Sequence, residues 1–248
     1  MIEQPEKKLD LKKNLFKLKY LLYSLFSGLL LGFSWPTFGV TILIFISLIP
    51  LFFLEKSIRQ DNYNYKMFRF FIYTFFSILT WNIITTWWLI NASVFGMIFA
   101  NIFNSFFYSL LFQIFFLSKK LLKENARFIF FICLWICYEK LNLNWEFSWP
   151  WLNLGNVFSE SIYWIQWYEY TGVFGGTLWV LIINVILFKA LNQHLENPDI
   201  KILTKKIIYL LILILLPIFF SISIYYRIDD PKKGINVIII QPNIDPYE

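Results

Sequence analysis

The chain has 248 residues, of which 58% are hydrophobic and only 15% charged, and its net charge is +6. A composition this apolar excludes a soluble globular protein and indicates an integral membrane protein. The single histidine and the two cysteines form no metal-binding pattern, so we expect neither a metal ion nor another cofactor.

Apolar segments long enough to cross a bilayer follow one another along most of the chain. A hydrocarbon core of about 30 Å requires roughly 20 helical residues. The sequence therefore predicts an all-α polytopic membrane domain over residues 1–226, with about seven transmembrane helices. The predicted spans are residues 18–35, 38–54, 70–90, 94–117, 126–145, 171–188 and 207–226. The first span follows a basic segment, as a signal peptide would, but no small-residue cleavage site comes after it.

Positive charges lie almost entirely in alternate connections. Eighteen of the 22 basic residues precede the first span or follow the second, fourth and sixth spans. The positive-inside rule then places the N-terminus in the cytoplasm and, after seven spans, the C-terminus on the outer side of the membrane. This asymmetry explains the net positive charge, so we expect no nucleic-acid partner.

The two cysteines, Cys133 and Cys137, lie four residues apart in the fifth span. Side chains at this spacing on an intact helix rarely meet disulfide geometry. We expect them to be small residues packed on one face of the helix.

The connection between the fifth and sixth spans, residues 145–176, is the most informative segment. Its tryptophans suit the membrane interface, where an amphipathic ring lies at headgroup level. A connection of this length is more often functional than a short one. Pro150 between two tryptophans, followed by Gly155, predicts a folded re-entrant or interfacial element.

Three acidic residues are expected at or near membrane depth: Glu139, Glu160 and Glu169. An ionisable group is costly there, which makes each a functional candidate. Glu139 is the strongest, because the apolar run of its span is too short to cross the bilayer without it. The alternative is that Glu139 snorkels to the interface as a pair with Lys140.

Small and polar residues mark the other spans. Gly172, Gly175 and Gly176 at the start of the sixth span allow close helix packing. Several amides in the third and fourth spans must hydrogen-bond across the bundle or line a wet cavity, because an unpaired amide in hydrocarbon is costly. They are Asn82, Asn91, Asn101, Asn104 and Gln113.

The last residues, 227–248, differ from the rest. The apolar, β-branched run 235–240 is closed by Gln241-Pro242-Asn243, which predicts a buried strand that runs into a turn. One strand buries nothing by itself. We therefore expect a linker and the first strand of an incomplete α/β domain.

These features together resemble apolipoprotein N-acyltransferase, the last enzyme of bacterial lipoprotein maturation. The resemblance covers essentially the whole chain. It is carried by Trp35-Pro36, Glu139, SWPWLNLGN (148–156), QWYEYTGVFGG (166–176), Asn184, a seventh span, and VIIIQPNID (237–245). The family usually places an Arg shortly after the Glu of its fifth span. Here Lys140 follows at once, with Asn142 and Asn144 beyond it, so the arginine of the corresponding ion pair has no direct counterpart in this sequence.

The resemblance implies transfer of an acyl chain from a phospholipid to the N-terminal diacylglyceryl-cysteine of an apolipoprotein, in the bacterial inner membrane. In the family, a Glu–Lys–Cys triad in a periplasmic nitrilase-like domain performs this chemistry. The triad lies downstream of the strand that ends this sequence, so we expect a truncated chain without catalytic residues. The implied lipid-binding or domain-docking candidates are Glu139, Trp149, Pro150, Trp151, Asn153, Gly155, Glu169, Gly172, Gly175, Gly176 and Asn184.

Three hypotheses remain open at this point. The chain is the membrane half of an acyltransferase whose nitrilase-like half is encoded separately or cut off by an interrupted reading frame. Alternatively, it is an inactive remnant of that enzyme. A third reading, an unrelated small transporter or membrane scaffold, requires charged residues that face each other at the bilayer midplane. The clear spans carry none well inside them, so this reading ranks last.

Overall fold

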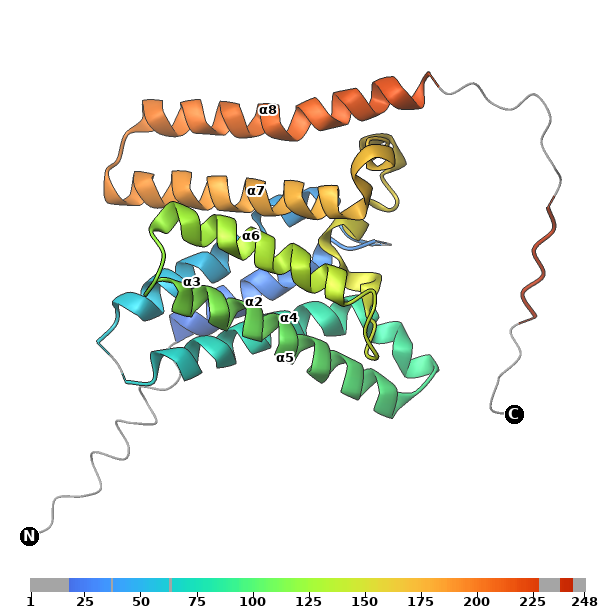
Figure 1. Cartoon of the computed structure of the whole chain (residues 1–248), viewed down its shortest axis with the longest axis horizontal. Helices are drawn as coiled ribbons and strands as arrows, with labels where there is room; N and C mark the ends of the chain where they lie inside the picture. The colour runs from blue at the N-terminus through green and yellow to red at the C-terminus, as the bar shows by residue number, and fades with distance from the viewer. Residues whose placement is uncertain (1–17, 37, 63, 228–236, 243–248) are drawn as a thin grey trace, which may run out of the picture.

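The computed structural model describes residues 18–36, 38–62, 64–227 and 237–242, and those up to residue 227 form a bundle of helices (Figure 1). Its α-helices are α2 (Leu18–Phe33), α3 (Ile49–Gln60), α4 (Lys66–Thr86), α5 (Val94–Ser118), α6 (Glu124–Leu141), α7 (Tyr168–Glu196) and α8 (Ile200–Tyr225). The described part of the chain contains no β-strand. The predicted class, an all-α membrane protein, is therefore confirmed.

Five helical segments are long and apolar enough to cross a membrane. They are Thr41–Gln60, Lys66–Asn91, Val94–Ser118, Tyr168–Glu196 and Ile200–Tyr225. The other two predicted spans also fall on helices, but α2 has only 16 residues and α6 carries four charged residues among its 18. The predicted count of seven spans is thus not confirmed. The fifth span ends earlier than expected, because tight turns take the chain out of the helix after Leu141.

The C-terminal strand is not confirmed either. Of the residues predicted to form it, Val237–Ile240 are described; they are exposed and adopt no regular secondary structure. The N-terminal lysines that precede Lys19, and most of the predicted linker, lie outside the described residues.

The turns between helices lie at two opposite ends of the bundle (Figure 1). We call the end with the turns after α3, α5 and α7 the basic end, because those turns and the adjoining helix ends carry most of the Lys and Arg residues. The other end, with the turns after α2, α4 and α6, is the tryptophan end. The segment after α6, residues 142–167, is the tryptophan loop.

Aromatic rings fill the centre of the bundle. Phe52 of α3 meets rings from three other helices, with centroids 5.4–6.0 Å apart: Phe115, Phe128, Phe131 and Phe188. All four pairs are edge-to-face or tilted, the arrangements that the ring quadrupole favours. The helices of the bundle are therefore held at defined distances by interlocking rings.

Hydrogen bonds between helices supplement the rings. Asn104 of α5 donates to Asn82 of α4 at 2.7 Å, and the Gln113 amide donates to the Met67 carbonyl at 3.0 Å. The prediction that some of the amides bond across the bundle is confirmed for these residues. Asn91, by contrast, is exposed in the 3₁₀ helix η2 (Trp87–Asn91).

Helix α8 lies along the edge of the bundle beside α7 (Figure 1), and only Leu210 and Ser221 of it are buried. Pro217 lacks an N–H, so the carbonyl of Leu213, four residues earlier, loses its usual helical donor. The indole N–H of Trp179 in α7 donates to that carbonyl at 2.9 Å. The carbonyl that Pro217 leaves without a helical donor thus forms a hydrogen bond between α8 and α7.

The expectation for the cysteines is wrong. Cys133 and Cys137 are exposed on α6 and do not pack against the bundle. The opposite face of the helix, with Phe131, Trp135 and Glu139, is the buried one.

Candidate functional site at the tryptophan end

The tryptophan loop is folded, as predicted. It contains three short 3₁₀ helices, η3 (Pro150–Leu152), η4 (Leu154–Phe158) and η5 (Ile162–Trp164). Several of its apolar residues are fully buried, including Leu154 and Phe158. The loop is therefore a packed part of the bundle and not a slack connection.

Glu139, near the end of α6, is fully buried and points into the protein. Its Oε1 accepts hydrogen bonds from the Trp135 indole at 3.0 Å and the Leu154 backbone N–H at 2.8 Å. Its Oε2 accepts from the Thr177 hydroxyl at 2.6 Å. Among the described residues it forms no ion pair. The snorkelling alternative is therefore wrong: Lys140 instead lies 5.9 Å from the centre of the Phe174 ring.

The carboxylate serves the beginning of η4. Leu154 and Gly155 are the first residues of that helix, so their N–H groups have no partner within it. Glu139 accepts the Leu154 N–H directly, and Thr177 accepts the Gly155 N–H at 3.0 Å while it donates to Glu139. A negative charge is favourable at a helix N-terminus. Glu139 therefore caps a helix that lies fifteen residues away in the sequence.

Two glycines allow the loop to touch α7. A Cβ on Gly155 would lie 2.1 Å from the Val173 carbonyl oxygen, and one on Gly176 would lie 1.7 Å from the Tyr168 hydroxyl. Neither distance is possible for real atoms. The close packing that the sequence predicts here is thus between a loop and a helix. Gly172, with φ of 64°, interrupts the helical conformation of α7 just before this contact.

The WPW motif lies next to this contact. Trp149 is half-buried, and its backbone N–H donates to the Asn142 carbonyl. Trp151 is 58% exposed, and its ring centroid lies 6.2 Å from that of Trp88, which is 42% exposed. Asn153 is buried at the entrance to η4. The loop thus buries one side and exposes Trp151 on the other, beside Trp88 of η2.

The concave feature under the loop is a cavity of about 190 Å³ between the loop and α5. Its walls are mainly aromatic, with amide groups from both sides. They include Phe99, Phe103, Asn104, Asn142, Trp145 and Trp149. This arrangement suits an amphiphilic ligand better than an ionic one.

The other candidates do not join this site. Glu160 and Glu169 are exposed, whereas Glu139 is fully buried. Gly175 lines an apolar groove of about 560 Å³ between α7 and α8. Asn184 holds the break before α3, where it accepts from the Leu48 N–H at 2.9 Å and donates to the Ile44 carbonyl at 2.8 Å. Within the described ranges, no three His, Cys, Asp or Glu side chains could hold a metal ion together.

Sequence reasoning missed the residues that bind Glu139. Trp135 lies four residues before it on the same helix face, a spacing that could have identified the pair. Thr177 comes from another helix and Leu154 from the loop, and no local pattern points to either of them.

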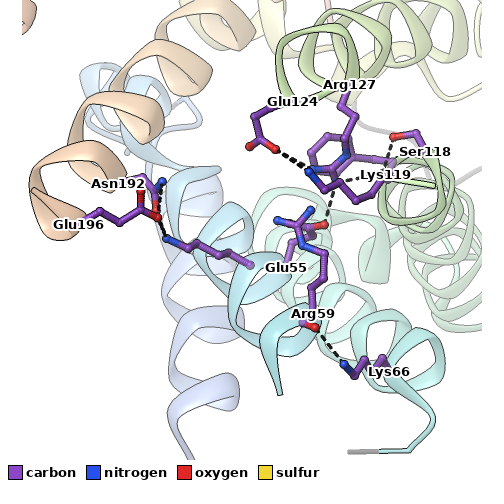
Figure 2. A network of polar contacts seen from close by, with 11 residues as sticks. Glu55, Arg59, Lys66, Ser118, Lys119, Glu124, Arg127, Asn192 and Glu196 are labelled. Carbon is purple, nitrogen blue, oxygen red and sulfur yellow. Dashed lines mark hydrogen bonds and ion pairs between the residues drawn. The ribbon is translucent and has the colours of Figure 1, made fainter. Parts of the chain in front are cut away.

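Sequence reasoning also missed a second buried carboxylate, Glu55, at the basic end (Figure 2). Glu55 of α3 accepts from Arg127 of α6 at 2.8 Å and lies 3.1 Å from the guanidinium of Arg59. Arg127 is fully buried, and its guanidinium lies 4.4 Å from the centre of the Phe115 ring. The sequence shows these residues only as charges near span ends, so their pairing was not predicted.

Comparison with known proteins agrees with the motifs. The family model of the apolipoprotein N-acyltransferase N-terminal domain matches residues 27–186, which include Glu139, the tryptophan loop and Gly176. A protein named apolipoprotein N-acyltransferase from Chlorobaculum tepidum is 27% identical over 229 residues, which are 90% of this chain and 41% of that protein. The protein of the same name from Geobacter metallireducens is 27% identical over 236 residues, 90% of this chain and 43% of the relative.

A third relative, apolipoprotein N-acyltransferase 2 from Treponema denticola, is 26% identical over 133 residues, 51% of this chain and 25% of its own length. No solved structure matches the chain significantly. The chain thus spans less than half the length of the curated relatives that it matches. The match to the family model nevertheless covers more than half of the chain, and the chain belongs to the apolipoprotein N-acyltransferase N-terminal domain family.

Proposed function

We propose that this chain is the membrane half of an apolipoprotein N-acyltransferase. The reaction moves an acyl chain from a phospholipid to the N-terminal diacylglyceryl-cysteine of a lipoprotein. The observation that carries the proposal is the tryptophan loop clamped by Glu139, which lies inside the region matched by the family. Burial of a carboxylate is costly, so its use to bind the loop supports a functional role for the conformation of this loop.

The acyl-transfer chemistry itself needs a thiolate beside a base. In the proposal, a nitrilase-like part supplies these groups, either further along the same protein or from a separate chain. The described residues supply the membrane anchor and the surface at which lipid and nitrilase-like part meet. Trp88 and Trp151 are the exposed contact residues of that surface. Glu139, Gly155 and Gly176 hold it in place from behind.

The proposed location is the bacterial inner membrane, with the basic end in the cytoplasm and the tryptophan end in the periplasm. The support is the excess of Lys and Arg in the turns and helix ends of the basic end, against one Lys in the turns and helix ends on the other side up to residue 226. A periplasmic tryptophan end faces the compartment in which lipoprotein N-termini are exposed.

The test is complementation. The chain is fused to the part of the Chlorobaculum tepidum protein that lies beyond the match, and the fusion replaces the host's own acyltransferase in a depletion strain. We expect lipoproteins with a third acyl chain, measured by mass spectrometry of their N-terminal peptides. Diacylated lipoproteins only, from a fusion that accumulates in the membrane, would contradict the proposal and favour the inactive remnant.

The chain alone provides the matched control. Membranes that contain it are incubated with a labelled phospholipid, and any thioester is detected by its release with hydroxylamine. We expect no label, because a nucleophilic thiol needs a neighbouring base. A hydroxylamine-sensitive label on Cys133 or Cys137 would place the chemistry in this half of the enzyme.

A further inference from the structure

We infer that Thr177 and Tyr168 of α7 form a clip that holds Gly155 against Gly176 and so positions the tryptophan loop. Thr177 and Tyr168 are positioning residues in this assignment, not catalytic ones. Their effect on acyl transfer rests on the proposed function, whereas the clip itself does not.

The clip binds both backbone polar groups of Gly155. The Gly155 N–H donates to the Thr177 hydroxyl oxygen at 3.0 Å, and the Tyr168 hydroxyl donates to the Gly155 carbonyl at 2.9 Å. Between these two bonds, the Gly155 Cα lies only 3.0 Å from the point that a Gly176 Cβ would occupy. The loop backbone therefore rests directly on the helix backbone, with one hydrogen bond on each side.

Glu139 sets the direction of the Thr177 bond. A threonine hydroxyl has one proton and can accept with its lone pairs. The proton goes to Glu139 Oε2 at 2.6 Å, which leaves the oxygen free to accept the Gly155 N–H. Thr177 is fully buried, so no water competes for either bond. Serine at this position would keep both bonds, and valine would keep the shape without them.

The position of Gly155 determines that of the WPW motif. Asn156, the next residue, donates from its side chain to the Pro150 carbonyl at 2.9 Å, and its backbone N–H donates to the Asn153 carbonyl at 2.8 Å. A displacement of Gly155 would move Asn156 and, with it, Pro150. Trp151 would then lose its fixed place beside Trp88.

The clip is tested by hydrogen exchange of the full chain in lipid nanodiscs, read by mass spectrometry on peptides that cover residues 150–158. The variants are Thr177→Val, Thr177→Ser and Tyr168→Phe. Thr85→Val is the matched control, because the Thr85 hydroxyl bonds only within its own helix. We expect about tenfold faster exchange in this segment for Tyr168→Phe, the effect of its one lost hydrogen bond. The increase for Thr177→Val should be at least as large, because this variant loses the bond to Gly155 and the bond to Glu139. Thr177→Ser and the control should match the unmodified chain.

Unchanged exchange in Thr177→Val, or a failure of serine to restore protection, would overturn the clip. If Thr177→Val does not accumulate, Tyr168→Phe tests the same prediction from the other side of Gly155. The same variants in the fusion enzyme give the functional readout: Thr177→Val should lower N-acylation and Thr177→Ser should preserve it. An inactive unmodified fusion would reject the proposed function but leave the exchange result valid. Faster exchange with unchanged N-acylation would reject the positioning role.

Discussion

The two ends of the bundle each bury a carboxylate, but they neutralise it differently. Glu55 at the basic end is surrounded by the guanidinium groups of Arg127 and Arg59 (Figure 2). Glu139 at the tryptophan end has only neutral donors, an indole, a hydroxyl and a backbone N–H. The first carboxylate joins two helices, and the second fixes a loop.

This difference indicates how strongly the buried carboxylate fixes the local structure at each end. A buried ion pair is costly to form and costlier to break, because removal of one partner leaves an uncompensated charge. A carboxylate held by neutral donors orders whatever donates to it without a second charge. The basic end is thus a fixed base for the bundle. The tryptophan end carries a loop whose order depends on a few hydrogen bonds.

The largest expected effect is at the basic end. Arg127→Ala should lower the free energy of unfolding by about 3–5 kcal/mol, because Glu55 then stays buried with less compensation. Thermal unfolding of the purified chain in detergent measures this. The control is Glu196→Ala, which removes an exposed partner of Lys56 and should leave stability almost unchanged. Equal stability of the two variants would remove the distinction between buried and exposed pairs.

A swap of charges sharpens the same point. Glu55→Arg combined with Arg127→Glu keeps opposite charges at the two positions, and it should recover part of the stability that either single substitution loses. Arg59 next to the new arginine limits the recovery, since Arg59 now faces a like charge. If the double variant is less stable than both single variants, the pair is not the source of the stability.

At the tryptophan end we expect a smaller and more local effect. Glu139→Ala leaves the buried Leu154 N–H and Trp135 indole N–H without an acceptor. This should lower the free energy of unfolding by about 1–3 kcal/mol. Limited proteolysis should then cut the tryptophan loop before the helices. Glu139→Gln keeps one acceptor oxygen, so its rate of loop cleavage should lie between that of the unmodified chain and that of Glu139→Ala. Glu169→Ala, at an exposed site, is the control. Cleavage of the loop at the same rate in Glu169→Ala and Glu139→Ala would contradict the assigned role of Glu139.

The comparison also shows what could be predicted from sequence. Hydropathy predicts which segments are helical but not where each helix ends, and Glu139 is a candidate because its span is too short without it. Its partners Leu154 and Thr177 were not predicted, because 15 and 38 residues separate them from Glu139. The pair Glu55–Arg127, 72 residues apart, was missed for the same reason. Such contacts depend on how helices pack, which hydropathy does not encode.

The cysteines show a second limit. Spacing places Cys133 and Cys137 on one face of α6, but it does not say which face is buried. Both faces of this helix carry apolar residues, because one contacts the bundle and the other is exposed at membrane depth. Only the packing of Phe131 and Trp135 against α5 decides the direction.

The smallest expected effect is at the edge of the bundle. Trp179→Phe keeps an aromatic ring, smaller than the indole, but removes the donor to the Leu213 carbonyl that Pro217 leaves free. One such hydrogen bond contributes about 0.5–1.5 kcal/mol. Thermal unfolding should therefore show a smaller loss than Glu139→Ala gives. A loss as large as that of Arg127→Ala would mean that neutral contacts matter as much as the buried ion pair.

The most direct test of the account is the side of the membrane on which each end lies. Alkaline phosphatase, which is active only in the periplasm, is fused after Asn91 or Asn144 at the tryptophan end and after Leu122 at the basic end. We predict activity for the first two fusions and none for the third, with the opposite pattern for a reporter that works only in the cytoplasm. Phosphatase activity after Leu122 but not after Asn144 would place the clamped loop in the cytoplasm, away from any lipoprotein N-terminus, and would contradict the account.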